Sequence, residues 1–172
     1  MTFSLCLLRK WRWRTFKRCS EPSAMKTKRK TNIAFWDTSS IVPLCCQQNL
    51  SQSMRKRWRE TARVVVWWGT TVEIRSAISR LYSEGILTAK GRQHALARLE
   101  VLRQEWREML PSDKARSIAE GLPDAYGLRA LDSFQLAAAL VWCNEKPKNR
   151  VFVCDDSKLS LAAQTIGFTV MP

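Results

Sequence analysis

The chain has 172 residues with 29 Lys and Arg, 15 Asp and Glu, six cysteines and one histidine, a length that allows one well-buried domain and excludes two of ordinary size. The lack of a CxxC pair and the single histidine exclude a zinc site. The apolar patch before Arg9 is too short for a signal peptide or a membrane span, so we expect a cytoplasmic protein with reduced thiols.

Most of the net charge of +14 is carried by the start of the chain. Residues 1–30 hold ten basic side chains and one acid, whereas the remainder holds 19 basic and 14 acidic side chains. Such a segment attracts polyanions such as RNA, DNA or anionic lipid, and its composition is also typical of an organelle transit peptide. We predict that residues 1–31 form a basic leader that is either disordered or not translated, with Met25 as the alternative start. Residues 32–172 are predicted to form the folded domain.

Apolar runs alternate with helical patterns along the rest of the chain. The patterns predict strands at residues 33–36, 62–68, 151–154 and 168–171, and helices at 39–47, 51–61, 70–85, 88–109, 112–126, 131–143 and 158–166. Pro43 is expected near the first turn of its helix, and Pro111 is expected to break the long charged helix that ends near Met109, with room for a short strand or turn there. Strands that alternate with helices predict an α/β fold, here a three-layer α/β/α sandwich around a mostly parallel central sheet.

Acidic residues stand where the predicted strands end and the helices begin. Asp37 follows the first strand, Glu73 opens the helix after the second strand, and Asp132 opens a helix that is apolar on nearly every face. Asp155 and Asp156 follow a later strand. Because the carboxyl ends of parallel strands meet at one edge of a sheet, we expect these carboxylates to gather there.

Each acid also has a simpler explanation. Asp37, Asp132 and Asp155 could cap helices, and Glu73 could pair with a solvent-facing arginine such as Arg75 or Arg80. Clustered carboxylates raise one another's pKa unless a cation lies among them, so we predict a raised pKa for Asp132. Ligands that are all oxygen favour Mg²⁺ or Mn²⁺. Such a cluster on a basic protein predicts phosphodiester hydrolysis, in which the metal activates a water and orients the phosphate.

Four stretches of the sequence resemble PIN-domain ribonucleases, and most closely the toxin half of VapBC-type toxin–antitoxin pairs. They are AFWDTSSIVPL, the glutamate of TTVEIRSAISRL, LRALDSFQLAAAL and VFVCDDSKLSLAAQTIGFTV. The resemblance covers the chain from about residue 32 to its end, and the third stretch is the most specific. It implies a compact α/β/α sandwich and a Mg²⁺- or Mn²⁺-dependent endoribonuclease, that is, a hydrolase of RNA phosphodiester bonds.

The resemblance also implies roles for single residues. It makes Asp37, Glu73, Asp132 and Asp156 the catalytic acids, with Asp37, Asp132 and Asp156 as metal ligands. The family's spacing to a later leucine and glycine selects Asp156 and leaves Asp155 as the alternative.

Two further positions match the family less completely. Ser39 matches a hydroxyl residue that supports the metal site, or it serves only as a cap. Cys154 stands where relatives commonly have Thr or Ser, so we expect weaker hydrogen-bonding support there. The implied partners are an RNA substrate, a cognate antitoxin that often blocks the pocket with a basic side chain, and a second copy in a homodimer; no membrane partner is implied.

Two other classes of protein stay open. A non-catalytic PIN-like module that binds RNA or a protein would share the fold, although all four acids are present in this chain. A receiver-type phosphoacceptor domain also clusters aspartates at strand ends. Its paired acids normally belong to the first strand, whereas the pair in this chain stands near the end.

Overall fold

The computed structural model describes residues 32–46 and 51–172. The predicted leader, residues 1–31, lies outside the described residues, as does the predicted end of the first helix at Gln47. Over the described residues, no helix is both long enough and apolar enough to cross a membrane.

Five parallel strands of the described chain form one sheet in the order β3-β2-β1-β4-β5. They are β1 (Ile33–Trp36), β2 (Arg63–Trp67), β3 (Trp106–Met109), β4 (Val151–Val153) and β5 (Thr169–Met171). The chain builds β1, β2 and β3 toward one edge and then returns to the other side of β1. This reversal creates a switch point between β1 and β4, the place where open α/β sheets hold their ligands.

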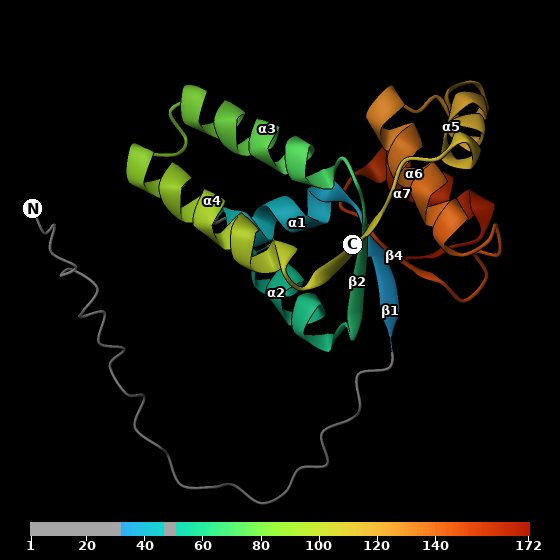
Figure 1. Cartoon of the computed structure of the whole chain (residues 1–172), viewed down its shortest axis with the longest axis horizontal. Helices are drawn as coiled ribbons and strands as arrows, with labels where there is room; N and C mark the ends of the chain where they lie inside the picture. The colour runs from blue at the N-terminus through green and yellow to red at the C-terminus, as the bar shows by residue number, and fades with distance from the viewer. Residues whose placement is uncertain (1–31, 47–50) are drawn as a thin grey trace, which may run out of the picture.

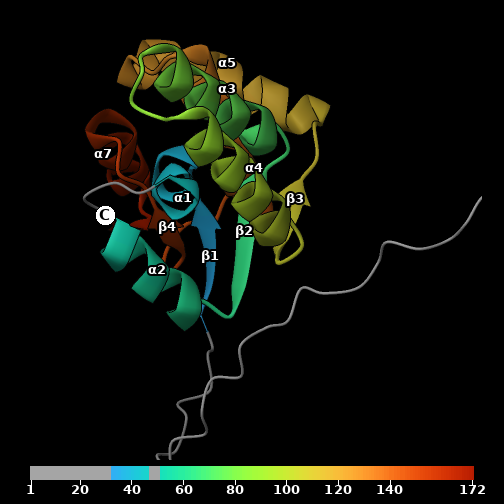
Figure 2. The same ribbon diagram turned by 90° about the vertical axis from the view of Figure 1, so that its left-hand side faces the viewer.

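Helices cover both faces of the sheet (Figures 1 and 2). One layer contains α1 (Thr38–Cys45), α2 (Ser51–Glu60), α3 (Thr70–Ser83) and α4 (Ala89–Arg103), and the other contains α5 (Asp113–Tyr126), α6 (Ala130–Trp142) and α7 (Ser157–Ile166). Right-handed connections place helices on one face while the chain moves toward β3 and on the other face after the reversal. The predicted three-layer sandwich is confirmed, and the described sheet is entirely parallel.

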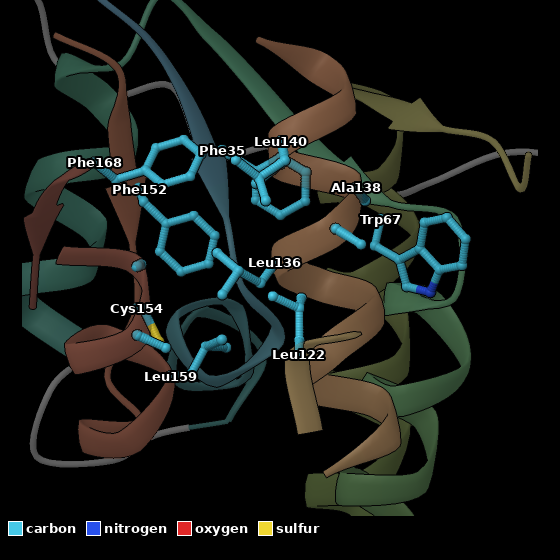
Figure 3. Close-up of a cluster of buried hydrophobic side chains, with 14 of the residues drawn as sticks. Phe35, Trp67, Leu122, Leu136, Ala138, Leu140, Phe152, Cys154, Leu159 and Phe168 are labelled. Carbon is cyan, nitrogen blue, oxygen red and sulfur yellow. The ribbon is translucent and has the colours of Figure 1, made fainter. Parts of the chain in front are cut away.

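Alternation along β1 holds the central strand between two cores. Phe35 joins the core under α5, α6 and α7, where its ring stacks on Phe152 with the centroids 5.6 Å apart (Figure 3). Ala34 and Trp36 point to the opposite face and join the core under α1 to α4. Because both faces of β1 are buried, the residue that follows the strand, Asp37, has a fixed position.

The structure differs from the sequence prediction around residues 104–110. The charged helix α4 ends at Arg103 rather than near Met109, and the edge strand β3 precedes Pro111. Trp106 pairs with Val64 of β2 and is buried. Pairing with β2 and burial of this aromatic side chain therefore override the helical pattern of the sequence.

The first helix also begins earlier than predicted. Asp37 is the cap of α1, so the helix begins at Thr38 and Pro43 is its sixth residue. The prediction that Pro43 lies near the first turn is therefore wrong. The proline removes the hydrogen bond that a residue at this position would donate to the Ser39 carbonyl, a loss that a short helix on a packed core tolerates.

Candidate active site

Asp37 follows β1 and caps α1, at the switch point of the sheet. Its Oδ2 accepts a hydrogen bond from the Ser39 backbone N–H at 2.9 Å, and the residue is buried. Burial raises the pKa of Asp37; hydrogen bonds from Ser39 and Thr38 oppose this, and the charge of Asp132 adds to it. Both interpretations of Asp37 therefore hold, because the residue caps a helix and also stands where α/β sheets bind ligands.

Glu73 lies in the first turn of α3 and its carboxylate contacts α6. Gln135 donates from Nε2 to both carboxylate oxygens, at 3.1 and 3.2 Å. Burial raises the pKa of Glu73, hydrogen bonds from Gln135 and Thr38 lower it, and the nearby aspartates raise it further. The alternative pairing with Arg75 is wrong, because that arginine instead forms an ion pair with Glu100 at 2.9 Å.

Gln135 connects the elements around this site, and the sequence analysis missed it. Its Nε2 also lies 2.7 Å from Thr38 Oγ1 and 3.3 Å from Thr70 Oγ1. The side chain is buried, and its Oε1 has no hydrogen-bond partner among the described residues. The sequence feature that could have revealed Gln135 is a single amide side chain in an otherwise apolar helix. Gln135 stands three residues after Asp132 and therefore lies on the same face of that helix.

Asp132 and Asp156 form the more exposed part of the cluster. Asp132 lies in the first turn of α6, and Asp156 caps α7 by accepting the Leu159 N–H at 2.8 Å. Burial and the charge of Asp156 raise the pKa of Asp132, whereas the Arg129 N–H and the charges of Arg129 and Lys158 lower it. The predicted direction of the Asp132 shift is confirmed.

Asp155 and Asp156 occupy different surroundings although they are adjacent. Asp155 is exposed, and its backbone N–H donates to Ser39 Oγ at 3.0 Å. Asp156 interacts electrostatically with Asp132 and is the actual cap of α7. The structure thus brings Asp156 to the cluster, whereas Asp155 contributes a backbone bond to the Ser39 side chain.

Cys154 supports Asp37 from the end of β4. Its Sγ lies 3.7 Å from Asp37 Oδ2 and 3.8 Å from Ser39 Oγ. Burial, together with the Asp37 charge, raises the pKa of the Cys154 thiol to about 12, so the group stays protonated. A thiol is a weak donor, and the expected weak support is therefore what the structure contains.

A pocket of about 600 Å³ opens beside Asp132 and Asp156. Its wall includes Arg129, Leu131 and Lys158 as well as the two acids. Cations next to carboxylates can bind the oxygens of a phosphate while the carboxylates bind a divalent metal.

The donor set of the cluster fits an oxygen-seeking divalent cation. Electrostatic interactions join Asp37 to Asp132, Glu73 to both, and Asp132 to Asp156. Within residues 32–46 and 51–172, however, no three Asp, Glu, His or Cys side chains lie close enough together to hold one ion. The chemistry of the four acids therefore fits Mg²⁺, but their side chains as placed do not surround it.

The fold is shared with solved structures. The crystal structure of VapBC2 from Rickettsia felis bound to a DNA fragment from their promoter is similar with a TM-score of 0.57 and 14% identity, over 81% of this chain and 97% of that chain. The crystal structure of FitAcB from Neisseria gonorrhoeae is similar with a TM-score of 0.56 and 17% identity, over 81% of this chain and 96% of that chain. No protein-family model matches the sequence, and no curated protein matches it significantly. At these identities the similarity establishes the fold.

Strand order also decides one of the alternatives. In a receiver-type domain the first strand lies between the second and the third. Here β1 lies between β2 and β4. The receiver interpretation is therefore wrong for this chain.

Proposed function

We propose that this protein is a metal-dependent endoribonuclease and the toxin component of a VapBC-type toxin–antitoxin pair. The observation that carries this proposal is the acid cluster at the switch point of the sheet. Four carboxylates from separate segments interact electrostatically there, although no three of the described acids surround one point, and burial and mutual repulsion raise the pKa of three of them, Asp37, Glu73 and Asp132. Raised pKa values of neighbouring carboxylates are more common at functional sites than elsewhere. The fold shared with VapBC2 and FitAcB supports the toxin assignment.

The proposed chemistry divides the work among the chain's residues. Asp37, Asp132 and Asp156 would hold Mg²⁺ or Mn²⁺. Glu73 would be the fourth catalytic carboxylate. When bound, the metal supplies an activated water and stabilises charge on the phosphate. Gln135 fixes the Glu73 carboxylate through its two contacts.

In the proposal, two cations bind the RNA backbone. Arg129 and Lys158 line the pocket beside Asp132. Phosphate contacts of this kind position a nucleic acid without selecting its sequence. In the proposal they hold the strand while the acids act on one phosphate.

The proposal includes two protein partners. A cognate antitoxin would complement the acid cluster with a basic side chain, and a second copy of the chain would form a homodimer. The names of the two similar structures, VapBC2 and FitAcB, support the expectation of a paired protein. Purification with the cognate partner is expected to suppress cleavage, because a basic side chain in the pocket competes with the metal and the phosphate.

The proposed activity is tested with mixed cellular RNA and the full chain in Mg²⁺, in Mn²⁺ and in EDTA. We expect discrete fragments with either metal, none in EDTA, and a loss of at least about a hundredfold for Asp37→Asn, because several kcal/mol of metal binding disappear. Asparagine also caps helices, so this variant keeps α1. Equal cleavage by Asp37→Asn and the wild type would refute the role of the acid cluster.

A second candidate is a non-catalytic PIN-like module that binds RNA or a protein. The spacing of the acids favours it, because the described side chains do not gather three ligands around one ion. RNA that stays intact with folded, metal-supplied protein, while still binding to it, would favour this candidate.

A further inference from the structure

A second pocket, of about 440 Å³, lies on the β2 and β3 side of the acid cluster. We call it the aromatic hollow; its wall includes Trp67, Trp68, Phe134, Pro111 and Arg116. Its volume falls within the range of about 300–1,000 Å³ that is typical of small-ligand sites.

The rings of the hollow divide into a fixed pair and an exposed face. Trp67 and Phe134 stack in parallel, with centroids 5.7 Å apart and planes at 4°. Trp67 borders the core under α6, away from Phe152 (Figure 3). Trp68 packs edge-on against Trp67 at 6.5 Å and is 52% exposed. Trp68 thus offers an aromatic surface that the core does not use.

The aromatic hollow and the acid cluster share their supporting segments. A Cβ on Gly69 would lie 2.7 Å from Trp67 Nε1 and 3.6 Å from Glu73 Oε1, so the indole and the carboxylate flank this glycine closely. Phe134 directly precedes Gln135, which bonds to Glu73. On α6, Phe134 therefore faces the hollow, and the next residue, Gln135, faces the acids.

We propose that the aromatic hollow binds one unpaired base of the RNA substrate by stacking on Trp68, an inference that rests on the proposed ribonuclease function. Unpaired bases stack on aromatic side chains, whereas duplex RNA hides its base faces. Arg116 and Asp113 both line the hollow and form an ion pair at 4.0 Å, so the wall carries no net charge and the aromatic surface carries the proposal. The arrangement directs cleavage to single-stranded RNA, with a base held beside the phosphate that reaches the acids.

The test measures RNA binding by the full chain in EDTA, so that it does not depend on cleavage. The probes are a short single-stranded oligoribonucleotide and the same strand with abasic riboses throughout. We expect Trp68→Ala to weaken binding of the first probe about tenfold, the size of one base–aromatic stack. Trp68→Phe should bind nearly as the wild type does, and the abasic strand should be insensitive to both changes.

A matched control comes from the far end of α3. Tyr82 is an exposed aromatic residue whose ring lies under the Arg92 guanidinium, 5.1 Å from its centroid. Tyr82→Ala removes a similar surface away from the hollow and should leave RNA binding unchanged. Equal affinity of Trp68→Ala and the wild type for the base-containing strand would overturn the proposal.

Other outcomes separate this inference from the proposed function. If Trp68→Ala changes the mass in analytical ultracentrifugation but not the RNA affinity, the hollow is a subunit interface and the base site is refuted. If binding depends on Trp68 but metal-loaded wild type leaves RNA intact, the nuclease proposal fails and the base site stands. If the wild type cleaves RNA and Trp68→Ala binds and cleaves it equally well, only the base site fails. No RNA binding by the wild type would overturn both.

Discussion

The two sides of the acid cluster differ in what surrounds their carboxylates. On the closed side, the oxygens of Asp37, which is buried, and of Glu73, which is half-buried, accept hydrogen bonds from Ser39 and Gln135. On the open side, Asp132 lies beside a pocket and near two cations. Hydrogen bonds within the protein hold the carboxylates of the closed side, whereas the carboxylates of the open side lie beside a pocket that a ligand can enter.

This difference assigns distinct tasks to the two sides. Preorganised groups in a water-excluded environment act without reorganisation when the reaction occurs. Carboxylates beside a pocket must instead exchange their present neighbours for the metal and the RNA when these bind. Substitutions on the open side should therefore remove ligand binding, whereas substitutions behind the closed side should alter the orientation and protonation of acids that remain present.

On the open side, the largest effect is expected from Asp156→Asn, comparable with that of Asp37→Asn. We expect cleavage of RNA in Mg²⁺ to fall about a hundredfold, because a charged metal ligand becomes neutral. Asparagine retains the cap of α7, so the melting temperature should change little. Asp155→Asn is the adjacent comparison and should reduce the rate less than about threefold, within the effect of an ordinary surface change. A greater loss of cleavage in Asp155→Asn than in Asp156→Asn would show that Asp155, and not Asp156, is the fourth acid of the site.

A smaller effect is expected behind the closed side, from Gln135→Leu. The change removes the donors that hold both oxygens of Glu73 and leaves a branched apolar side chain of comparable volume. Because a hydrogen bond to a charged group contributes about 1.5–3 kcal/mol, we expect a loss of cleavage of about tenfold or more. Gln164→Leu, an exposed change in α7, is the control. Unchanged cleavage and unchanged Mg²⁺ dependence in Gln135→Leu would show that Glu73 needs no positioning.

The two sides were also unequally predictable from the sequence. Asp37 and Asp156 follow short buried strands, and a capping pattern correctly marked Asp37; for α7 the pattern pointed to the adjacent Asp155, whereas Asp156 is the cap. Their meeting follows from topology, because parallel strands end at one edge of the sheet. The family resemblance then assigned their roles. These positions could be found because strand ends and caps are local features.

Contacts between distant segments escaped the sequence analysis. Gln135 meets Thr38 and Thr70 only after α6 packs across the sheet, because these partners are 97 and 65 positions away in the sequence. The strand at Trp106 was missed for the same reason, because its pairing with β2 is decided in the folded protein. Neither contact leaves a periodic pattern, so neither the polar network nor the edge strand could be derived from spacing.

Protonation provides a third way to test the closed side, with a modest expected effect on stability. The pKa values of Asp37 and Glu73 are raised in the folded protein, so their contribution to stability is present below pH about 4 and is lost as the pH rises through the raised values. At pH 7 in EDTA we expect Asp37→Asn to melt a few degrees above the wild type, and at pH 4 the difference should shrink.

Differential scanning calorimetry at both pH values measures this effect. Asp124→Asn, an exposed change in α5, controls for the loss of one negative charge. Addition of Mg²⁺ should raise the melting temperature of the wild type and leave Asp37→Asn nearly unchanged, because a ligand stabilises the state that binds it. A lower melting temperature for Asp37→Asn at pH 7 would contradict the burial of an unfavourable charge.

The smallest expected effect concerns the thiol behind Asp37. Cys154→Ser replaces a weak donor with a hydroxyl, which donates more strongly to the Asp37 carboxylate and lowers its pKa. Cleavage should therefore extend to slightly lower pH, with a change in rate at pH 7 below about threefold, because the substitution strengthens an existing hydrogen bond to Asp37 rather than adding or removing one. Cys143→Ser is the control, since that buried thiol donates to the Leu140 carbonyl and not to an acid. A cleavage profile displaced to higher pH in Cys154→Ser would mean that the shorter hydroxyl fails to reach Asp37, and that the size of the sulfur atom, rather than its hydrogen bond, is what the closed side requires.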